Sequence, residues 1–255
     1  MFKALLENDQ LMIIAVAMAL FMVGYSVTTS FGVYYFRYAF KDDSLYMAFC
    51  VVLAIAQLTA LSTFPLFRKK FTRKQLYIGS MISVVVSYLL FFLSFEFFPL
   101  VVVAGLGLFF GQAFIQLLML LFLADAIEYG EWKLGKRNEA VSFAVQPFIN
   151  QFGSAISKLM VTGTLVISAI NPIEDAIKDL AETDPKRQQL IETVGPGSVW
   201  IMKVAMMIIP LILIIIGFVL YMKKFRIDEE FYQQILTDLA SKPKKKKKKK
   251  VSKRK

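Results

Sequence analysis

Histidine is absent from the 255 residues, and Cys50 is the single cysteine. These two absences exclude zinc sites with histidine ligands, cysteine–histidine nucleophile pairs and a disulfide framework. The chain also has no phosphate-binding Gly-Lys-Ser/Thr motif and no His-Glu-x-x-His motif. No pair of acids stands in a pattern that indicates acid–base catalysis. We therefore predict that the protein is not an enzyme and has no metal or other cofactor.

Charged residues are scarce as well. They make up 19% of the chain, whereas soluble domains contain about 25%. Apolar residues reach 57%, with 24 Phe and 12 Met, and the mean hydropathy is +0.58. The apolar residues form long runs without charge, which indicates that these segments lie in lipid. We expect an all-α membrane protein, because an open strand edge in lipid would leave backbone groups unpaired.

The net charge of +11 has a local origin. From Lys223 onward, 14 basic residues outnumber four acidic ones, so this tail carries +10 and residues 1–222 carry only +1. The basicity therefore belongs to the tail, and it does not indicate binding to nucleic acid.

Six segments are long and apolar enough to span a bilayer, since about 20 helical residues cover roughly 30 Å of hydrocarbon. They lie near residues 11–37, 45–67, 75–95, 98–124, 141–170 and 199–222. Residues 1–222 are thus expected to form one six-helix membrane unit. A short surface helix is expected in the connection between the last two spans, around residues 172–194.

The loops predict the orientation. Residues 68–74 carry five positive charges, which favours the cytoplasmic side. The connection 171–198 has six acids and three bases, which fits the outside. An even number of spans then brings both termini to the cytoplasm. Within the cytoplasmic tail 223–255, residues 227–239 form an amphipathic pattern, and the lysine run after Pro243 is expected to be disordered. That run is either a solvated end of the chain or a segment attracted to anionic membrane lipid.

Polar residues inside the fifth span are the strongest functional candidates, because charged and polar groups in lipid are costly without a partner or a cavity. Candidates with helical spacing form two adjacent stripes: Gln146, Asn150, Gly153 and Ser157, and next to them Gln151, Ser154 and Lys158. Such stripes can serve close helix packing. The number of amides favours the wall of a polar pathway.

Two further spans carry polar residues. Gln112 and Gln116 lie one turn apart on one face of the fourth span. Their amides can form hydrogen bonds to a neighbouring helix, or they can recognise hydroxyl groups, since amides both donate and accept. The first span carries Tyr25, Thr28 and Thr29 near its middle, and we interpret this hydroxyl cluster as part of the same pathway.

Alternating acids and bases follow the fourth span. Asp125, Glu128, Tyr129 and Arg137 lie in this stretch, which suits a network of ion pairs at a helix end. A network of this kind can break and re-form, so it is a candidate gate. We expect Arg137 to fold back onto the Asp125 and Glu128 carboxylates, or to reach acids outside this chain.

The residues from Asp125 to Glu139 (DAIEYGEWKLGKRNE) and from Ser142 to Ala155 (SFAVQPFINQFGSA) form a nearly continuous motif. It resembles the glycoside–pentoside–hexuronide:cation symporters, the melibiose-carrier-like branch of the major facilitator superfamily. Residues 7–36 resemble the seventh helix of that family, and residues 225–239 resemble its C-terminal ending. Two positions depart from the family: Gln151 aligns with a common lysine, and Gln116 aligns with an aromatic that stacks on sugar.

The resemblance implies twelve helices in two halves, which move a sugar together with Na⁺ or H⁺ by alternating access. The six spans would be the C-terminal half, and an N-terminal six-helix half would be the partner that supplies the cation-binding carboxylates. It also implies a gating role for Asp125, Glu128, Tyr129 and Arg137, and a bacterial cytoplasmic membrane. The alternatives are a carrier of a non-sugar substrate, a half-carrier that does not transport, and a truncated fragment.

Overall fold

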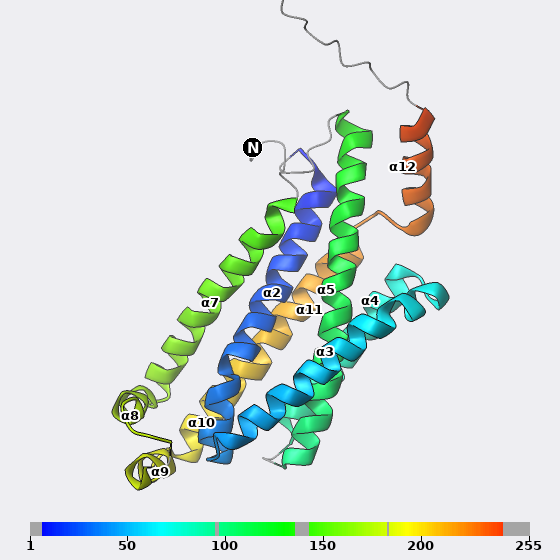
Figure 1. Cartoon of the computed structure of the whole chain (residues 1–255). Coiled ribbons are helices and arrows are strands. Elements are labelled where there is room, and N and C mark those ends of the chain that lie inside the picture. Colours follow the sequence, from blue (N-terminus) through cyan, green and yellow to red (C-terminus); the bar gives the residue numbers. More distant parts are fainter. Residues whose placement is uncertain (1–6, 95–96, 136–142, 183, 242–255) are drawn as a thin grey trace, which may run out of the picture.

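The computed structural model describes residues 7–94, 97–135, 143–182 and 184–241 (Figure 1). All regular elements within these ranges are helices. The elements are α2 (Asp9–Tyr35), η1 (Phe36–Phe40), α3 (Ser44–Lys70), α4 (Arg73–Phe92), α5 (Phe98–Leu134), α7 (Val145–Ile167), α8 (Asn171–Ile177), α9 (Pro185–Glu192), α10 (Pro196–Lys203), η2 (Val204–Ile208), α11 (Ile209–Lys224) and α12 (Glu229–Ser241). The expected all-α membrane fold is confirmed.

Among the described residues, five helical stretches are long and apolar enough to cross a membrane by themselves: α2 with η1, α3, α4, α5, and α10 through α11. The helix α7 reaches the same threshold only together with α8, and the two are bent by 101° relative to each other. The polar residues of α7 explain this difference, because they lower the hydropathy of a helix that is 23 residues long. The structure therefore has five candidate spans, or six if α7 and α8 form one.

Some helix ends differ from the expected positions. The helix α5 continues to Leu134, well beyond residue 124, and ends where Gly135 adopts a left-handed conformation with φ of 66°. The surface connection forms two short helices, α8 and α9, in place of one. The amphipathic tail helix is α12, and the lysine run lies outside the described residues.

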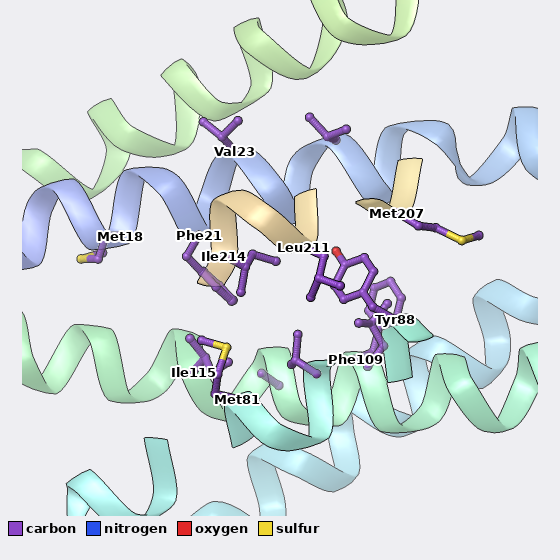
Figure 2. Close-up of a cluster of buried hydrophobic side chains, with 14 of the residues drawn as sticks. Met18, Phe21, Val23, Met81, Tyr88, Phe109, Ile115, Met207, Leu211 and Ile214 are labelled. Atoms are coloured by element: carbon purple, nitrogen blue, oxygen red, sulfur yellow. The ribbon is translucent and has the colours of Figure 1, made fainter. Parts of the chain in front are cut away.

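The helices α2 and α5 are the most buried spans and form the centre of the bundle. The helix α5 packs on α4, α3 and α2, while α2 packs on α7 and α11. Figure 2 shows part of this core, in which Phe21 of α2 and Ile214 of α11 lie opposite Ile115 of α5 and Met81 of α4. All four side chains are almost fully buried.

Gly24 of α2 and Gly217 of α11 allow the close approach of these two helices. A Cβ atom on Gly24 would lie 2.8 Å from Cγ1 of Ile214 and 3.0 Å from the backbone oxygen of Pro210. Small residues are common at such contacts, because lipid gives helices little hydrophobic reason to associate and van der Waals packing must hold them together.

We therefore expect Gly24→Leu to lower the free energy of unfolding by about 1–3 kcal/mol, the usual cost of overpacking. Equilibrium denaturation in mixed micelles measures this change. Gly163→Leu on α7 is the matched control, since a Cβ there meets nothing within 4 Å. Equal stability of the two variants would contradict the proposed close packing.

Candidate functional site

A cavity of about 250 Å³, which we call the central cavity, lies among four helices of the bundle. Its lining residues come from α2 (Met18, Met22, Tyr25), α3 (Gln57, Leu61), α5 (Ala113, Gln116, Leu117, Met119, Leu120) and α7 (Gln146, Asn150). Both central helices contribute to it. The structure thus brings together four residues that the sequence analysis selected: Tyr25, Gln116, Gln146 and Asn150.

The polar part of the lining is uncharged. It consists of one phenol and four side-chain amides, and the apolar part is formed by methionine, leucine and alanine. The Gln57 amide donates a hydrogen bond of 3.4 Å to the Tyr25 hydroxyl, which links α3 to α2 across the cavity wall. Amides and phenols both donate and accept hydrogen bonds, so this lining can bind a molecule rich in hydroxyl groups.

Gln57 is the polar residue of the cavity lining that the sequence analysis missed. It is a lone amide within the apolar stretch Phe49–Leu61 of α3, and it has no polar neighbour at helical spacing toward the N-terminus. The signal was therefore a single costly residue in the middle of a span, rather than a stripe.

Gln112 does not line the cavity, although it precedes Gln116 by one turn. Its side chain is 1% exposed, and neither amide atom has a hydrogen-bond partner among the described residues. A buried amide without partners costs about 1–3 kcal/mol, which makes Gln112 an unusual residue in the centre of α5.

The hydroxyl groups of the two threonines in α2 form hydrogen bonds with helices of the bundle. The Thr28 hydroxyl lies 3.0 Å from the carbonyl oxygen of Met206 in η2 and 2.6 Å from the Tyr88 hydroxyl of α4. Either hydroxyl can donate in the bond between Thr28 and Tyr88. Thr29 bonds to the carbonyl oxygens of Tyr25 and Ser26 on its own helix. Neither threonine lines the cavity.

The second stripe of α7 also lies outside the cavity. Gln151 and Lys158 are exposed on the surface of the chain. In the later part of the first stripe, Gly153 approaches the backbone of Met22, and Ser157 lies 3.2 Å from the hydroxyl of Ser30. This part of α7 serves helix packing against α2.

One end of the bundle carries residues 68–74 and α12 (Figure 1), and we call it the basic end. Several charged residues lie in these segments. Asp125 of α5 is buried and forms an ion pair with Arg73 at the start of α4. The Arg73 guanidinium also lies 5.1 Å from the centre of the Tyr232 ring, and its backbone N–H donates to Glu229. Arg73 therefore joins α4, α5 and α12. Arg137, the expected partner of Asp125, lies outside the described residues.

The other predicted gate residues lie nearby. The Tyr129 hydroxyl donates to Asp9 of α2 over 3.2 Å, and Lys133 pairs with the same carboxylate at 2.7 Å. Glu128 has one buried carboxylate oxygen without a partner among the described residues. Burial and the Glu128 carboxylate raise the pKa of the Tyr232 phenol to about 12, so this phenol stays protonated at physiological pH.

The ion pair of Arg73 and Asp125 borders a second cavity of about 500 Å³ between α4, α5, α11 and the start of α12. The ion pair thus lies at the wall of a space between helix ends, and the gating role of Asp125 stays a prediction.

The opposite end has a network that the sequence analysis did not identify. Arg37 of η1 pairs with Asp43 at 3.0 Å and with Glu174 of α8 at 2.6 Å. Arg187 of α9 pairs with the same Asp43, and Tyr38 donates to Glu174. The network fixes the short helices α8 and α9 to the end of α2. Within the described ranges, no group of three acidic or cysteine side chains could hold a metal ion.

Comparisons with known proteins agree with this architecture. The family profile described as MFS/sugar transport protein matches residues 1–229. The raffinose carrier protein of Pediococcus pentosaceus is 29% identical over 93% of this chain and 35% of its own length. The lactose permease of Lactobacillus delbrueckii subsp. bulgaricus is 26% identical over 93% of this chain and 36% of its own length. The lactose permease of Leuconostoc lactis is 34% identical over 66% of this chain and 26% of its own length. The chain thus spans about a third of the length of these relatives.

Removing one partner of a buried ion pair usually costs about 3–5 kcal/mol, because the other charge stays buried. Arg73 and Asp125 are 15% and 6% exposed, so we expect Arg73→Gln to lower the free energy of unfolding by about 3 kcal/mol. Lys133→Gln is the control, because its pair with Asp9 is about half exposed and should contribute less than about 1 kcal/mol.

Equilibrium denaturation of both variants in mixed micelles measures the difference. Adding Asp125→Asn to Arg73→Gln should recover part of the stability, since no charge then remains buried. Equal effects of Arg73→Gln and Lys133→Gln would show that the buried pair has no special role.

Proposed function

Because the chain belongs to the MFS/sugar transport protein family, we propose that it forms one half of a secondary carrier that moves a sugar across a membrane by alternating access. The observation that carries this proposal is the central cavity, whose polar lining consists of amides and one phenol. Such a lining suits the many hydroxyl groups of a neutral sugar. Relatives named for raffinose and lactose support the same substrate class.

The cavity alone is incomplete as a carrier site. Four helices form its wall, and the chain spans about a third of the length of its relatives. In alternating access, two bundles rock around a central site, so a second six-helix half would complete the cavity. We infer that this N-terminal half is the functional partner.

Coupling to Na⁺ or H⁺ is the part of the proposal that depends on the partner. Among the described residues, no carboxylate lines the central cavity. A cation site near the sugar would therefore need acidic residues from the other half, in agreement with the family resemblance of residues 125–155. This half would supply hydrogen bonds to the sugar, and the other half would supply the charges.

We place the carrier in the cytoplasmic membrane of a bacterium, with both termini in the cytoplasm. The charge distribution supports this orientation, because Arg68, Lys69 and Lys70 at the basic end favour the cytoplasmic side. The network of Arg73 and Asp125 would then be the cytoplasmic gate.

The first test concerns the incomplete site. We expect the chain alone, reconstituted in liposomes, to show no sugar uptake driven by a Na⁺ or H⁺ gradient. Uptake clearly above that of empty liposomes would contradict the assignment as half a carrier.

The second test uses a chimera of this chain and the N-terminal half of the Pediococcus raffinose carrier. We expect Gln57→Met, Gln146→Met and Asn150→Leu each to weaken sugar affinity by about ten-fold, the effect of one lost hydrogen bond to the ligand. Counterflow with labelled sugars gives the affinity. Gln233→Met on the exposed face of α12 is the control and should have no effect.

If the chimera transports and all three cavity variants keep normal affinity, the central cavity is not the sugar site. If it fails to transport although both halves are inserted, the alternative of a half-carrier that does not transport becomes the better account.

A further inference from the structure

A groove of about 270 Å³ lies between α3 and α4, with α5 as its floor. It shares no lining residue with the central cavity. Its walls include Phe67 and Phe71 at the end of α3, Gly79 on α4, and Phe110 and Phe114 on α5. The groove therefore lies on a flank of the bundle, close to the basic end.

The aromatic rings pack against one another and leave the groove open. Phe110 stacks on Phe114 at 4.8 Å, and Phe67 meets Phe114 edge-on at 5.4 Å. A Cβ on Gly79 would meet nothing within 4 Å, so the α4 side is open as well. The hydroxyl of Ser83, which also lines the groove, donates to the carbonyl of Gly107, and this removes a polar group from the space. The interior suits a hydrocarbon chain.

Positive charges lie at one end of this apolar space. Arg68, Lys69 and Lys70 stand between Phe67 and Phe71 in the sequence, and all three are exposed. Phe67 stacks on Phe71 at 6.3 Å, so the helix turn that carries these charges borders the groove directly. An apolar groove that ends at a cluster of cations is complementary to an anionic phospholipid, which has an apolar acyl chain and a negatively charged headgroup.

We propose that the groove binds one acyl chain of an anionic phospholipid, with the headgroup phosphate against Lys69 and Lys70. Basic residues at a membrane surface attract anionic lipids, and the phenylalanine walls add a specific position for the chain. A helix from another protein subunit could fill an apolar groove, but it has no need for cations at the end. The charge complementarity therefore favours the lipid.

Native mass spectrometry of the full chain in detergent tests the proposal. The chain is incubated with equal amounts of phosphatidylglycerol and phosphatidylcholine, and the retained lipids are counted. We expect phosphatidylglycerol to exceed phosphatidylcholine by at least about ten-fold.

Two independent variants should abolish most of this preference. Gly79→Trp fills the groove, and Lys69→Gln with Lys70→Gln removes the charges. Each has a matched control: Gly163→Trp, which also adds a ring at an open glycine, and Lys223→Gln with Lys224→Gln, which removes two exposed charges from the same end. Both controls should keep the preference. Circular dichroism verifies the helical fold of all four.

Equal retention of the two lipids, or equal loss in a variant and its control, would overturn the proposal. The same spectra give the mass of the assembly. If Gly79→Trp keeps phosphatidylglycerol but dissociates a dimer, the groove is an interface between two copies of the chain and the lipid assignment is wrong.

Discussion

The close packing of α2 and α5 at the centre of the bundle is the constraint on which the other features depend. Lipid offers helices little hydrophobic gain from association, so they are held by fit between side chains and backbones. Gly24 gives α11 access to the surface of α2, and the buried side chains of Figure 2 fill the space that remains. This arrangement leaves another face of the two central helices for α3 and α7, and the central cavity lies among these four. The ion pairs at both ends then connect the shorter helices to the same centre.

The same packing decides which polar residues can meet a ligand. Thr28 faces α4 and η2, so its hydroxyl stabilises helix contacts, whereas Tyr25, less than one turn earlier, borders the cavity. At the basic end, Asp125 is buried against Arg73, and its charge is neutralised by a neighbouring helix. The cavity thus has uncharged hydrogen-bonding groups, and the ion pairs lie at the ends of the bundle. We expect this distribution in a carrier that binds a neutral solute and opens by movement of its helix ends.

Much of this fold depends on local sequence patterns and could therefore be predicted from the sequence. The apolar runs gave the spans, and the motif of residues 125–155 gave the family, which the comparisons confirm. Helical spacing also placed Gln146 and Asn150 on one face of α7. What the sequence analysis missed depends on long-range packing: no local pattern tells that Arg73, 52 residues away in sequence, pairs with Asp125, or that the lone Gln57 bonds to Tyr25. Thr29 satisfies its hydroxyl on its own helix, which a count of polar residues could not reveal.

The central claim is that a sugar occupies the cavity next to Asn150, and thiol labelling tests it most directly. Asn150→Cys is introduced together with Cys50→Ser into the chimera with the raffinose carrier half, and its reaction rate with a maleimide is measured with and without raffinose. The account predicts that the sugar slows labelling at position 150 several-fold, whereas Lys158→Cys on the exposed surface of the chain reacts at the same rate in both conditions. Equal labelling of Asn150→Cys with and without a sugar that the chimera transports would contradict the account.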